Sequence, residues 1–252
     1  MSRLFGKTAI ITGGASGIGR EIAILFSQHG ANVVLVGLEE DKLNCIKEEI
    51  GEKVEIHCVD ITDEKTVVGI VEKTEEKFGV PDILVNCAGI YAEGTATKTD
   101  YSTWQKIIDV NLSGAFLCSK YVASSMLKRG TGGTIINISS EAGIAAIAGQ
   151  VAYNVSKAAM ISLSNSMAVD YAQDNIRVNC VCPGRVLTPL VQNIIDNSEN
   201  PKETFDKLSH DRPVMRMGAP KDIAYACLHF ADNSMPYATG AVLSVDGGYT
   251  AR

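Results

Sequence analysis

Residues 12–19 read Thr12-Gly13-Gly14-Ala15-Ser16-Gly17-Ile18-Gly19. The run directly follows an apolar strand-like segment and precedes a segment with helical periodicity. Glycines at such a junction permit a tight turn and let the main chain approach a ligand closely. The helix that begins there offers free N–H groups and the positive end of its dipole. The stretch therefore predicts a binding site for a dinucleotide pyrophosphate.

Outward from this loop, apolar β-branched runs alternate with longer segments that carry apolar residues at helical spacing. Most runs are continuously apolar, as is typical of parallel strands covered on both faces. We expect strands over 8–12, 33–36, 54–59, 83–86, 134–138, 177–181 and 241–245. We expect helices near 18–28, 39–50, 64–78, 101–128, 153–172 and 220–231. Since parallel strands need right-handed crossover helices, the pattern predicts an α/β, Rossmann-like, doubly wound fold with a seven-stranded parallel sheet and helices on both faces.

The 252 residues contain no proline- or glycine-rich linker, charge run or internal repeat that would divide them. We therefore expect a single dinucleotide-binding domain over residues 1–252. Residues 187–217 are a polar stretch that carries Pro189, Pro201 and Pro213. Because long insertions often serve as binding loops, we expect this stretch to form a helical lid over a substrate.

The composition excludes several classes of protein. Hydrophobic residues make up 46% and charged residues 21%, so a core can form without disulfides or metals. The net charge of -6 disfavours a nucleic-acid partner. Seven cysteines without paired spacing are typical of a reducing cytosol and indicate no metal site. With no long apolar stretch, we expect a cytoplasmic protein without membrane contact.

Tyr153 and Lys157 lie four residues apart on an expected helix, and hence on one face of it. A free phenol, with a reference pKa of about 10, is a weak base at neutral pH. A nearby ammonium stabilises the phenolate, as acid/base catalysis requires. Alone, this pair could equally be an amphipathic surface pair. Ser140, thirteen residues upstream, and Asn111 extend the pattern.

Together these motifs resemble the short-chain dehydrogenase/reductase family, whose loop spacing is Gly-x-x-x-Gly-x-Gly rather than Gly-x-Gly-x-x-Gly. The resemblance continues through residues 177–179, 183–188 and 244–249, and so spans nearly the whole chain. It implies a catalytic tetrad of Asn111, Ser140, Tyr153 and Lys157. In that reading Ser140 hydrogen-bonds the substrate oxygen and Tyr153 exchanges its proton. Lys157 binds the nicotinamide ribose and stabilises the phenolate, and Asn111 holds a water that links Lys157 to solvent.

Ser139 stands next to Ser140 and is the competing hydroxyl. Strand alternation aims the two side chains at opposite faces of the sheet. The family spacing selects Ser140, so we expect Ser139 to have no catalytic role.

The resemblance also implies the cofactor contacts. NAD-preferring members usually carry an acid where Gly37 stands, and NADP-preferring members often carry a basic residue where Leu38 or Ser16 stands. Neither is present here, whereas Glu39 and Glu40 disfavour a ribose phosphate by repulsion, or simply complement a helix dipole. We therefore expect NAD and leave NADP open.

The cofactor contacts implied by the resemblance fall into four groups. The glycine loop and the second strand end contribute Gly13, Ser16, Gly17, Ile18, Gly19 and Leu38. Asp60 and Ile61 correspond to the adenine contact, and Asn86, Ala88 and Gly89 to an Asn-Asn-Ala-Gly turn in which Cys87 replaces the second Asn. Tyr153 and Lys157 serve the cofactor as well as catalysis. Pro183, Gly184, Val186 and Thr188 cover the nicotinamide amide.

The substrate is less constrained, because one scaffold serves polyols, sugars, steroids and acyl thioesters. Glu141, Gln150 and Arg185 stand at positions that face substrate in relatives, although each could instead lie at a solvated rim. Three polar residues predict a small polar secondary alcohol or ketone, such as a polyol, sugar or hydroxy acid.

Two other functions stay open at this point. One is a 3-oxoacyl-(acyl-carrier-protein) reductase, which the absence of an NADP signature disfavours. The other is a noncatalytic dinucleotide sensor, which the four filled catalytic positions disfavour. The resemblance further implies a homotetramer formed through two long helices.

Overall fold

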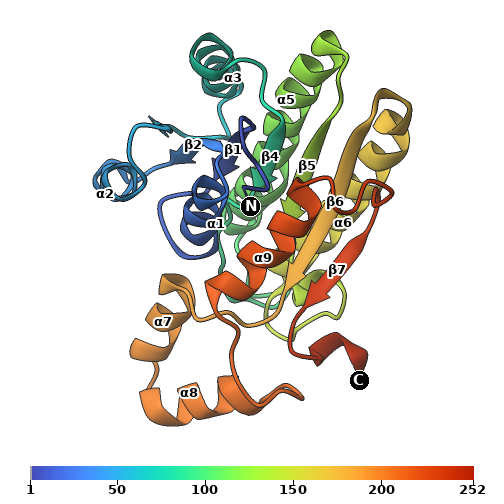
Figure 1. Cartoon of the computed structure of the whole chain (residues 1–252). Helices are drawn as coiled ribbons and strands as arrows, with labels where there is room; N and C mark the ends of the chain where they lie inside the picture. The colour runs from blue at the N-terminus through green and yellow to red at the C-terminus, as the bar shows by residue number, and fades with distance from the viewer. Residues whose placement is uncertain (1) are drawn as a thin grey trace.

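The computed structural model describes residues 2–252. Within these residues, seven parallel strands form one sheet in the order β3-β2-β1-β4-β5-β6-β7 (Figure 1). The strands are β1 (Thr8–Thr12), β2 (Asn32–Gly37), β3 (Val54–Cys58), β4 (Ile83–Asn86), β5 (Gly133–Ile138), β6 (Ile176–Pro183) and β7 (Val242–Val245). The predicted fold class is confirmed. The strand order reverses between β1 and β4, so a crevice for ligands is expected beyond their carboxyl ends.

Helices cover both faces of the sheet and divide the core into two layers. On one face lie α1 (Gly17–Gln28), α2 (Glu40–Ile50) and α9 (Pro220–Ala231). On the other lie α3 (Glu64–Phe78), α5 (Ala115–Arg129) and α6 (Val151–Tyr171). The alternation along β1 shows how one strand serves both layers, because Ala9 and Ile11 join the first and Ile10 the second. No helix within residues 2–252 is long and apolar enough to cross a bilayer.

The expectation of one unbroken helix over residues 101–128 is wrong. The segment comprises α4 (Tyr101–Ile108), a π-helical turn η1 (Asp109–Gly114) and then α5. A π-turn inserts one extra residue into the helical repeat and re-aims the side chains on it. The apolar pattern continues across the insertion, which is why sequence periodicity does not reveal it.

Residues 187–217 contain two further helices, α7 (Pro189–Asp196) and α8 (Pro201–His210). Both begin with a proline, and the side chains of Thr188 and Asn200 cap them by accepting main-chain N–H groups. In Figure 1 they project below the sheet, beyond the carboxyl ends of the strands. Three short 3₁₀ turns complete the structure: η2 (Glu141–Gly143), η3 (Ala172–Asp174) and η4 (Tyr249–Ala251).

Candidate active site

The glycine loop joins β1 to α1 in a conformation in which a Cβ atom at Gly13 or Gly19 would clash with the main chain. Gly13 has φ of +67°, and a Cβ there would lie 2.8 Å from the main-chain nitrogen of Ala88. A Cβ on Gly19 would overlap the carbonyl oxygen of Gly13. Ser16 precedes α1 without forming a side-chain cap, and the first turn of α1 contains no acid. The exposed main-chain N–H groups at this helix start therefore fit a pyrophosphate.

The end of β4 is tied to the end of β1 by main-chain donors. Cys87 and Ala88 both donate N–H bonds of 3.1 Å to Thr12 Oγ1. The Asn86 side chain is buried, and its Nδ2 donates to Asn137 Oδ1 at 2.8 Å and to Ser119 Oγ at 2.9 Å. Nδ2 is thus committed to bonds within the protein and Oδ1 is buried, so a cofactor contact at Asn86 would fall to its main chain.

The end of β2 carries no cation for a ribose phosphate. Leu38 is 69% exposed. Glu39 precedes α2 and forms an ion pair with Lys42, as suits a helix start. Beyond β3, Asp60 Oδ1 accepts bonds of 2.9 Å from the main-chain N–H and the hydroxyl of Thr62, so this exposed carboxylate is held by a local turn. Ile61 next to it is buried.

Tyr153 and Lys157 share the face of α6 that meets the end of β5. The Lys157 side chain is buried and its Nζ donates to Ile138 O at 2.9 Å. The same Nζ lies 5.7 Å from the centre of the Tyr153 ring. Tyr153 is partly buried. The structure thus places a fixed ammonium beside a partly buried phenol.

The two neighbouring serines have different partners. Ser139 Oγ donates to Lys157 O at 2.7 Å and so joins β5 to α6. Ser140 Oγ accepts the N–H of Ala142 at 3.1 Å. The Ser140 hydroxyl proton is therefore left for another acceptor, which favours Ser140 over Ser139 as the hydroxyl that meets a substrate.

Asn111 lies in the π-turn η1 and is fully buried. Its Oδ1 accepts the N–H of Ile90 at 2.7 Å, and its Nδ2 donates to Ile90 O at 3.0 Å and to Ser156 Oγ at 3.1 Å. A Cβ on Gly89 would lie 3.3 Å from Asn111 Oδ1 and 3.4 Å from Lys157 Nζ. The structure thus brings Asn111, Lys157 and Gly89 together.

Tyr91 is a neighbour of Tyr153 that the sequence analysis missed. The two rings meet edge to face, with centroids 5.4 Å apart. Burial raises the pKa of Tyr91, and the nearby Glu93, which accepts its hydroxyl at 3.1 Å, adds to the rise. Tyr91 therefore stays a neutral donor at the side of Tyr153. The only available signal was an aromatic residue two positions after the Asn-Cys-Ala-Gly turn.

The three predicted substrate residues differ in their surroundings. Gln150 directly precedes α6 without a side-chain capping bond, and it forms a parallel bridge with Gly94, which ties the segment after β4 to the start of α6. Arg185 is partly buried and lies 3.5 Å from Asp211. Glu141 is buried and pairs with Arg212 at 3.2 Å. Glu141 and Arg185 therefore both have charged partners within the protein.

The turn after β6 meets the glycine loop. Thr188 approaches Gly17, where a Cβ would lie 3.3 Å from the Thr188 side chain. Val186 is buried and pairs with Gly218, and Pro183 ends β6. The structure thus places this predicted nicotinamide segment next to the predicted pyrophosphate site.

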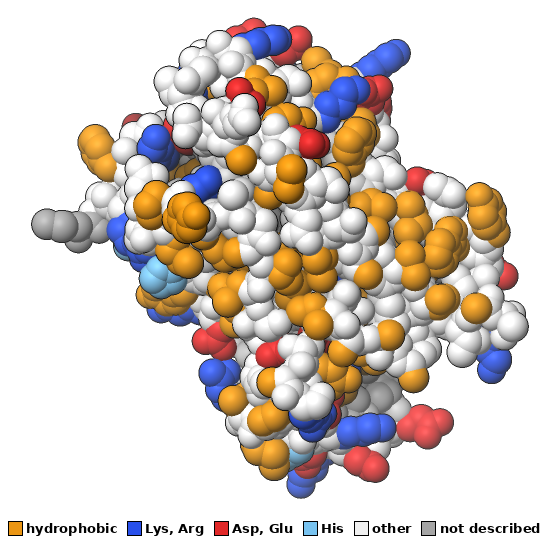
Figure 2. Space-filling view, turned by 90° about the vertical axis from the view of Figure 1, so that its right-hand side faces the viewer, with side chains coloured by type: hydrophobic (Ala, Val, Ile, Leu, Met, Phe, Trp, Pro, Cys, Tyr) orange, Lys and Arg blue, Asp and Glu red, His pale blue; other side chains and the backbone are white. Residues whose placement is uncertain are grey.

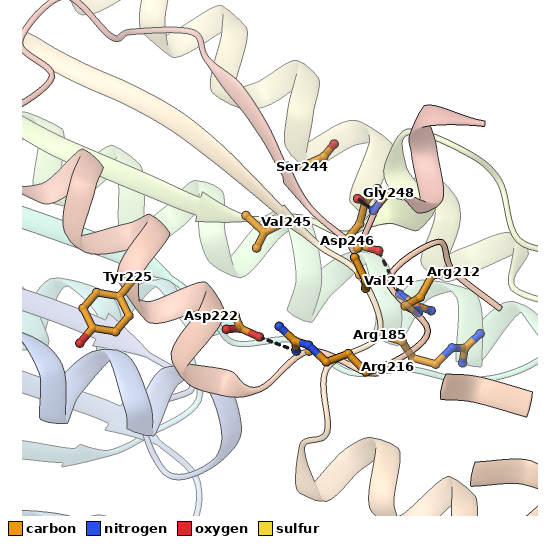
Figure 3. Close-up of a pocket in the computed structure, with 13 residues that line it drawn as sticks. Arg185, Arg212, Val214, Arg216, Asp222, Tyr225, Ser244, Val245, Asp246 and Gly248 are labelled. Atoms are coloured by element: carbon orange, nitrogen blue, oxygen red, sulfur yellow. Dashed lines mark hydrogen bonds and ion pairs between the residues drawn. The ribbon is translucent and has the colours of Figure 1, made fainter. Parts of the chain in front are cut away.

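A cavity of about 460 Å³ lies beside this turn, between β7, α9 and the end of the 187–217 stretch (Figure 3). It shares Gly184 and Arg185 with the predicted site, but none of the four catalytic candidates lines it. Its lining includes three arginines and two aspartates, and Arg216 pairs with Asp222 at 3.1 Å. Among residues 2–252, no group of three or more potential metal ligands gathers there or elsewhere.

Comparison with known proteins agrees with this geometry. Residues 13–250 match the family described as Enoyl-(Acyl carrier protein) reductase. The NADP-dependent (R)-specific alcohol dehydrogenase of Lentilactobacillus kefiri is 39% identical over 254 residues, which cover 99% of each chain. A 3-oxoacyl-(acyl-carrier-protein) reductase of Thermotoga maritima is 35% identical over 249 residues, or 98% of each chain.

A solved structure is similar along the whole chain. The aldohexose dehydrogenase of Thermoplasma acidophilum superposes with a TM-score of 0.90 at 32% identity, over 100% of this chain and 96% of that one. Family match, relatives and fold agree from the glycine loop to the last strand. The chain belongs to the short-chain dehydrogenase/reductase family, whose oxidoreductases use NAD(P).

Proposed function

We propose that the protein is an NAD(P)-dependent oxidoreductase that interconverts a secondary alcohol and a ketone on a small polar molecule, with NAD as the preferred cofactor. The observation that carries the proposal is the convergence of Tyr153, Lys157 and Asn111 beside Gly89, at the carboxyl end of the sheet. Ser140 approaches from the end of β5 with its hydroxyl proton free to be donated.

In the reduction, the Ser140 hydroxyl donates a hydrogen bond to the ketone oxygen and holds the carbonyl. The chemistry that a nicotinamide held by the glycine loop and residues 183–188 would supply is a hydride for the carbonyl carbon, or its acceptance in the reverse direction. Tyr153 gives its proton to the oxygen on which negative charge develops, so ketone, hydride and proton balance to an alcohol. Lys157 stabilises the resulting phenolate, since its ammonium is fixed beside the ring.

The residues present fit a dinucleotide. The α1 start and the glycine loop would hold the pyrophosphate, the ends of β2 and β3 the adenosine, and residues 183–188 the nicotinamide amide. NAD is preferred in this proposal because Leu38 offers no charge to a ribose phosphate and Glu39 lies nearby. The similarity to an NADP-dependent alcohol dehydrogenase makes NADP the alternative.

A polar substrate is supported by Gln150 and Arg185 and by the likeness to an aldohexose dehydrogenase. The second candidate is reduction of a 3-oxoacyl thioester on a carrier protein, favoured by the Thermotoga maritima relative.

We further propose that residues 1–252 form one domain and that α7 and α8 close over the substrate. All seven cysteines are free, which supports a cytoplasmic location.

A homotetramer of this chain is also part of the proposal. A closed tetramer with two-fold axes needs two different self-complementary surfaces. Helices α5 and α6 offer one, where Phe116, Val155 and Val169 are exposed. The second is the face that carries β7, where apolar side chains gather with charged ones mainly toward the edges (Figure 2) and where Val242 and Leu243 are exposed.

The first prediction concerns the catalytic hydroxyls. Initial rates are measured by nicotinamide absorbance, with both cofactors, on polyols, sugars, hydroxy acids and a 3-oxoacyl thioester. Tyr153→Phe removes the proton donor and should lower kcat by about 100- to 10,000-fold. Ser140→Ala should lower kcat by about 100- to 1,000-fold, because one donor to the substrate oxygen is lost.

Ser139→Ala is the matched control. It removes one buried hydrogen bond, so it should lower the free energy of unfolding by about 1 kcal/mol and leave kcat within about tenfold. Equal rates for wild type and Tyr153→Phe, or a larger loss for Ser139→Ala than for Ser140→Ala, would contradict the proposed roles.

The second prediction concerns substrate polarity. Gln150→Leu should raise KM for a polar substrate by about three- to tenfold, and Arg185→Leu by about tenfold or more, because each loses a hydrogen-bond donor. Gln173→Leu and Arg216→Leu, at exposed positions, are the controls and should leave KM unchanged. If KM is the same in all four variants, the polar-pocket proposal is wrong.

The third prediction concerns assembly. Light scattering should give the mass of four chains for the wild type. Val169→Asp places a charge on the exposed α6 surface and should reduce the mass to two chains. Lys73→Asp, on exposed α3, should remain tetrameric. A monomeric wild type would refute the tetramer.

A further inference from the structure

Arg212 is a buried cation that the reaction described above does not use. It is 2% exposed and is the bulkiest of the fully buried side chains. It is the second residue after α8 and lies within the 187–217 stretch. Burying a guanidinium is costly unless it is paired and hydrogen-bonded, so its partners define what it does.

Those partners come from three separate segments of the chain. Arg212 Nε donates to Asp211 Oδ1 at 2.9 Å. Its Nη1 donates to the carboxylate of Glu141 at 3.2 Å and to the main-chain oxygen of Asp246 at 3.3 Å. Figure 3 shows Arg212 turned toward Asp246, whereas Arg216, four residues later, turns to Asp222. Arg212 thus connects the segment after α8 to the residue that follows β7 and to the segment after Ser140.

The turn after β6 leaves room for this connection only because residue 184 is glycine. A Cβ at Gly184 would lie 2.6 Å from Arg212 Nη1 and 2.8 Å from Glu141 Oε2. The Arg212–Glu141 ion pair therefore packs directly on the predicted nicotinamide turn.

Glu141 is also the first residue of η2, which carries the partner of the catalytic serine. The main-chain oxygen of Glu141 accepts the N–H groups of Ile144 and Ala145 at 3.0 and 2.9 Å. Ser140 Oγ accepts the N–H of Ala142 in the same turn. A three-residue 3₁₀ turn has weak hydrogen bonds and little stability of its own. Its position therefore depends on what holds it from outside.

Two contacts hold η2 from opposite sides. On one side Gly143 packs against the main chain of Lys157, where a Cβ would lie 2.8 Å from Lys157 O. On the other side the Glu141 carboxylate is held by Arg212. The orientation of the Ser140 hydroxyl thus rests on both α6 and the end of the 187–217 stretch.

We propose that Arg212 is a positioning residue: its ion pair with Glu141 fixes η2 and so aims the Ser140 hydroxyl at the substrate oxygen. The inference rests on the proposed function, because it assigns Ser140 that role. Arg212 itself touches no substrate. Because Arg212 lies two residues after α8, the ion pair links the orientation of the Ser140 hydroxyl to the position of α8.

The main test compares Arg212→Met with Arg216→Met, a control that removes an exposed arginine from the same segment. Rates are measured with the carbonyl compound that the wild type reduces fastest in the panel above. Arg212→Met should lower kcat by about 10- to 100-fold through a displaced hydroxyl, with KM and NADH affinity within about threefold of wild type. Arg216→Met should match the wild type in all three. Equal kcat in the two variants would overturn the proposal.

A second variant separates positioning from stability. Arg212→Met leaves Glu141 buried without its cation, whereas Glu141→Leu combined with Arg212→Met removes both charges. The double variant should recover the melting temperature of the wild type and keep the low kcat of Arg212→Met. If kcat recovers together with the melting temperature, the ion pair is only structural and the proposal is wrong.

The pH dependence of the melting temperature tests whether Glu141 is left without a cation in Arg212→Met. Burial raises the pKa of Glu141, and Arg212 opposes the rise. Without Arg212 the folded state binds this proton more tightly than the unfolded state, so stability is present at low pH and is lost as pH rises through the folded pKa. Relative to the double variant, Arg212→Met should lose melting temperature as pH rises above the pKa of a free glutamate. An equal pH dependence in both would contradict the pairing.

Amide hydrogen exchange tests whether Arg212 holds η2 in place, and it needs no measurement of activity. Arg212→Met should increase exchange at Ala142, Ile144 and Ala145 by at least about tenfold, and Arg216→Met should not. Unchanged exchange in Arg212→Met would overturn the proposal. A wild type that turns over no compound, with the exchange difference intact, would refute the proposed function and still support the link between Arg212 and η2.

Discussion

The structure depends on the close approach of main chain at the first strand–helix junction. Gly13 lies against Ala88, and Gly19 against Gly13, so closely that neither position admits a Cβ without movement of the main chain. This contact brings the start of α1 next to the end of β4, at the point where the strand order reverses. A dinucleotide can therefore meet helix N–H groups and a strand crevice at once.

The catalytic candidates depend in turn on buried hydrogen bonds between segments distant in sequence. Lys157 reaches Ile138, Ser139 reaches Lys157, and Asn111 reaches Ile90. These bonds are buried or partly buried and therefore costly to leave unmade. They fix α6 to β5 and the π-turn to the segment after β4, so the carboxyl end of the sheet becomes one rigid platform.

The fold can be predicted from the sequence because buried parallel strands are continuous apolar runs. The predicted strands 8–12 and 83–86 and the predicted helix 64–78 have the same bounds in the structure. It fails at the π-turn, since an inserted residue does not interrupt the apolar pattern. It also misses contacts set by the tertiary fold alone: Arg212 lies 71 residues from Glu141. Asn86 stays a predicted cofactor contact, and its Nδ2 binds Asn137 and Ser119, which leaves its main chain for that contact. Tyr153 and Lys157 lie on one helix and could be predicted to be neighbours, whereas Glu141, Arg185 and Arg212 come from separate segments.

Hydride transfer is the central claim, and isotope transfer measures it directly. NADH carrying deuterium on one face of C4 is incubated with the wild type and the carbonyl compound that it reduces fastest, and the product alcohol is analysed by mass spectrometry and NMR. One deuterium is expected on the carbinol carbon from one labelled face only, because a cofactor held at the carboxyl end of the sheet would present a single side of its nicotinamide. A product alcohol that carries no deuterium from either labelled face would contradict it.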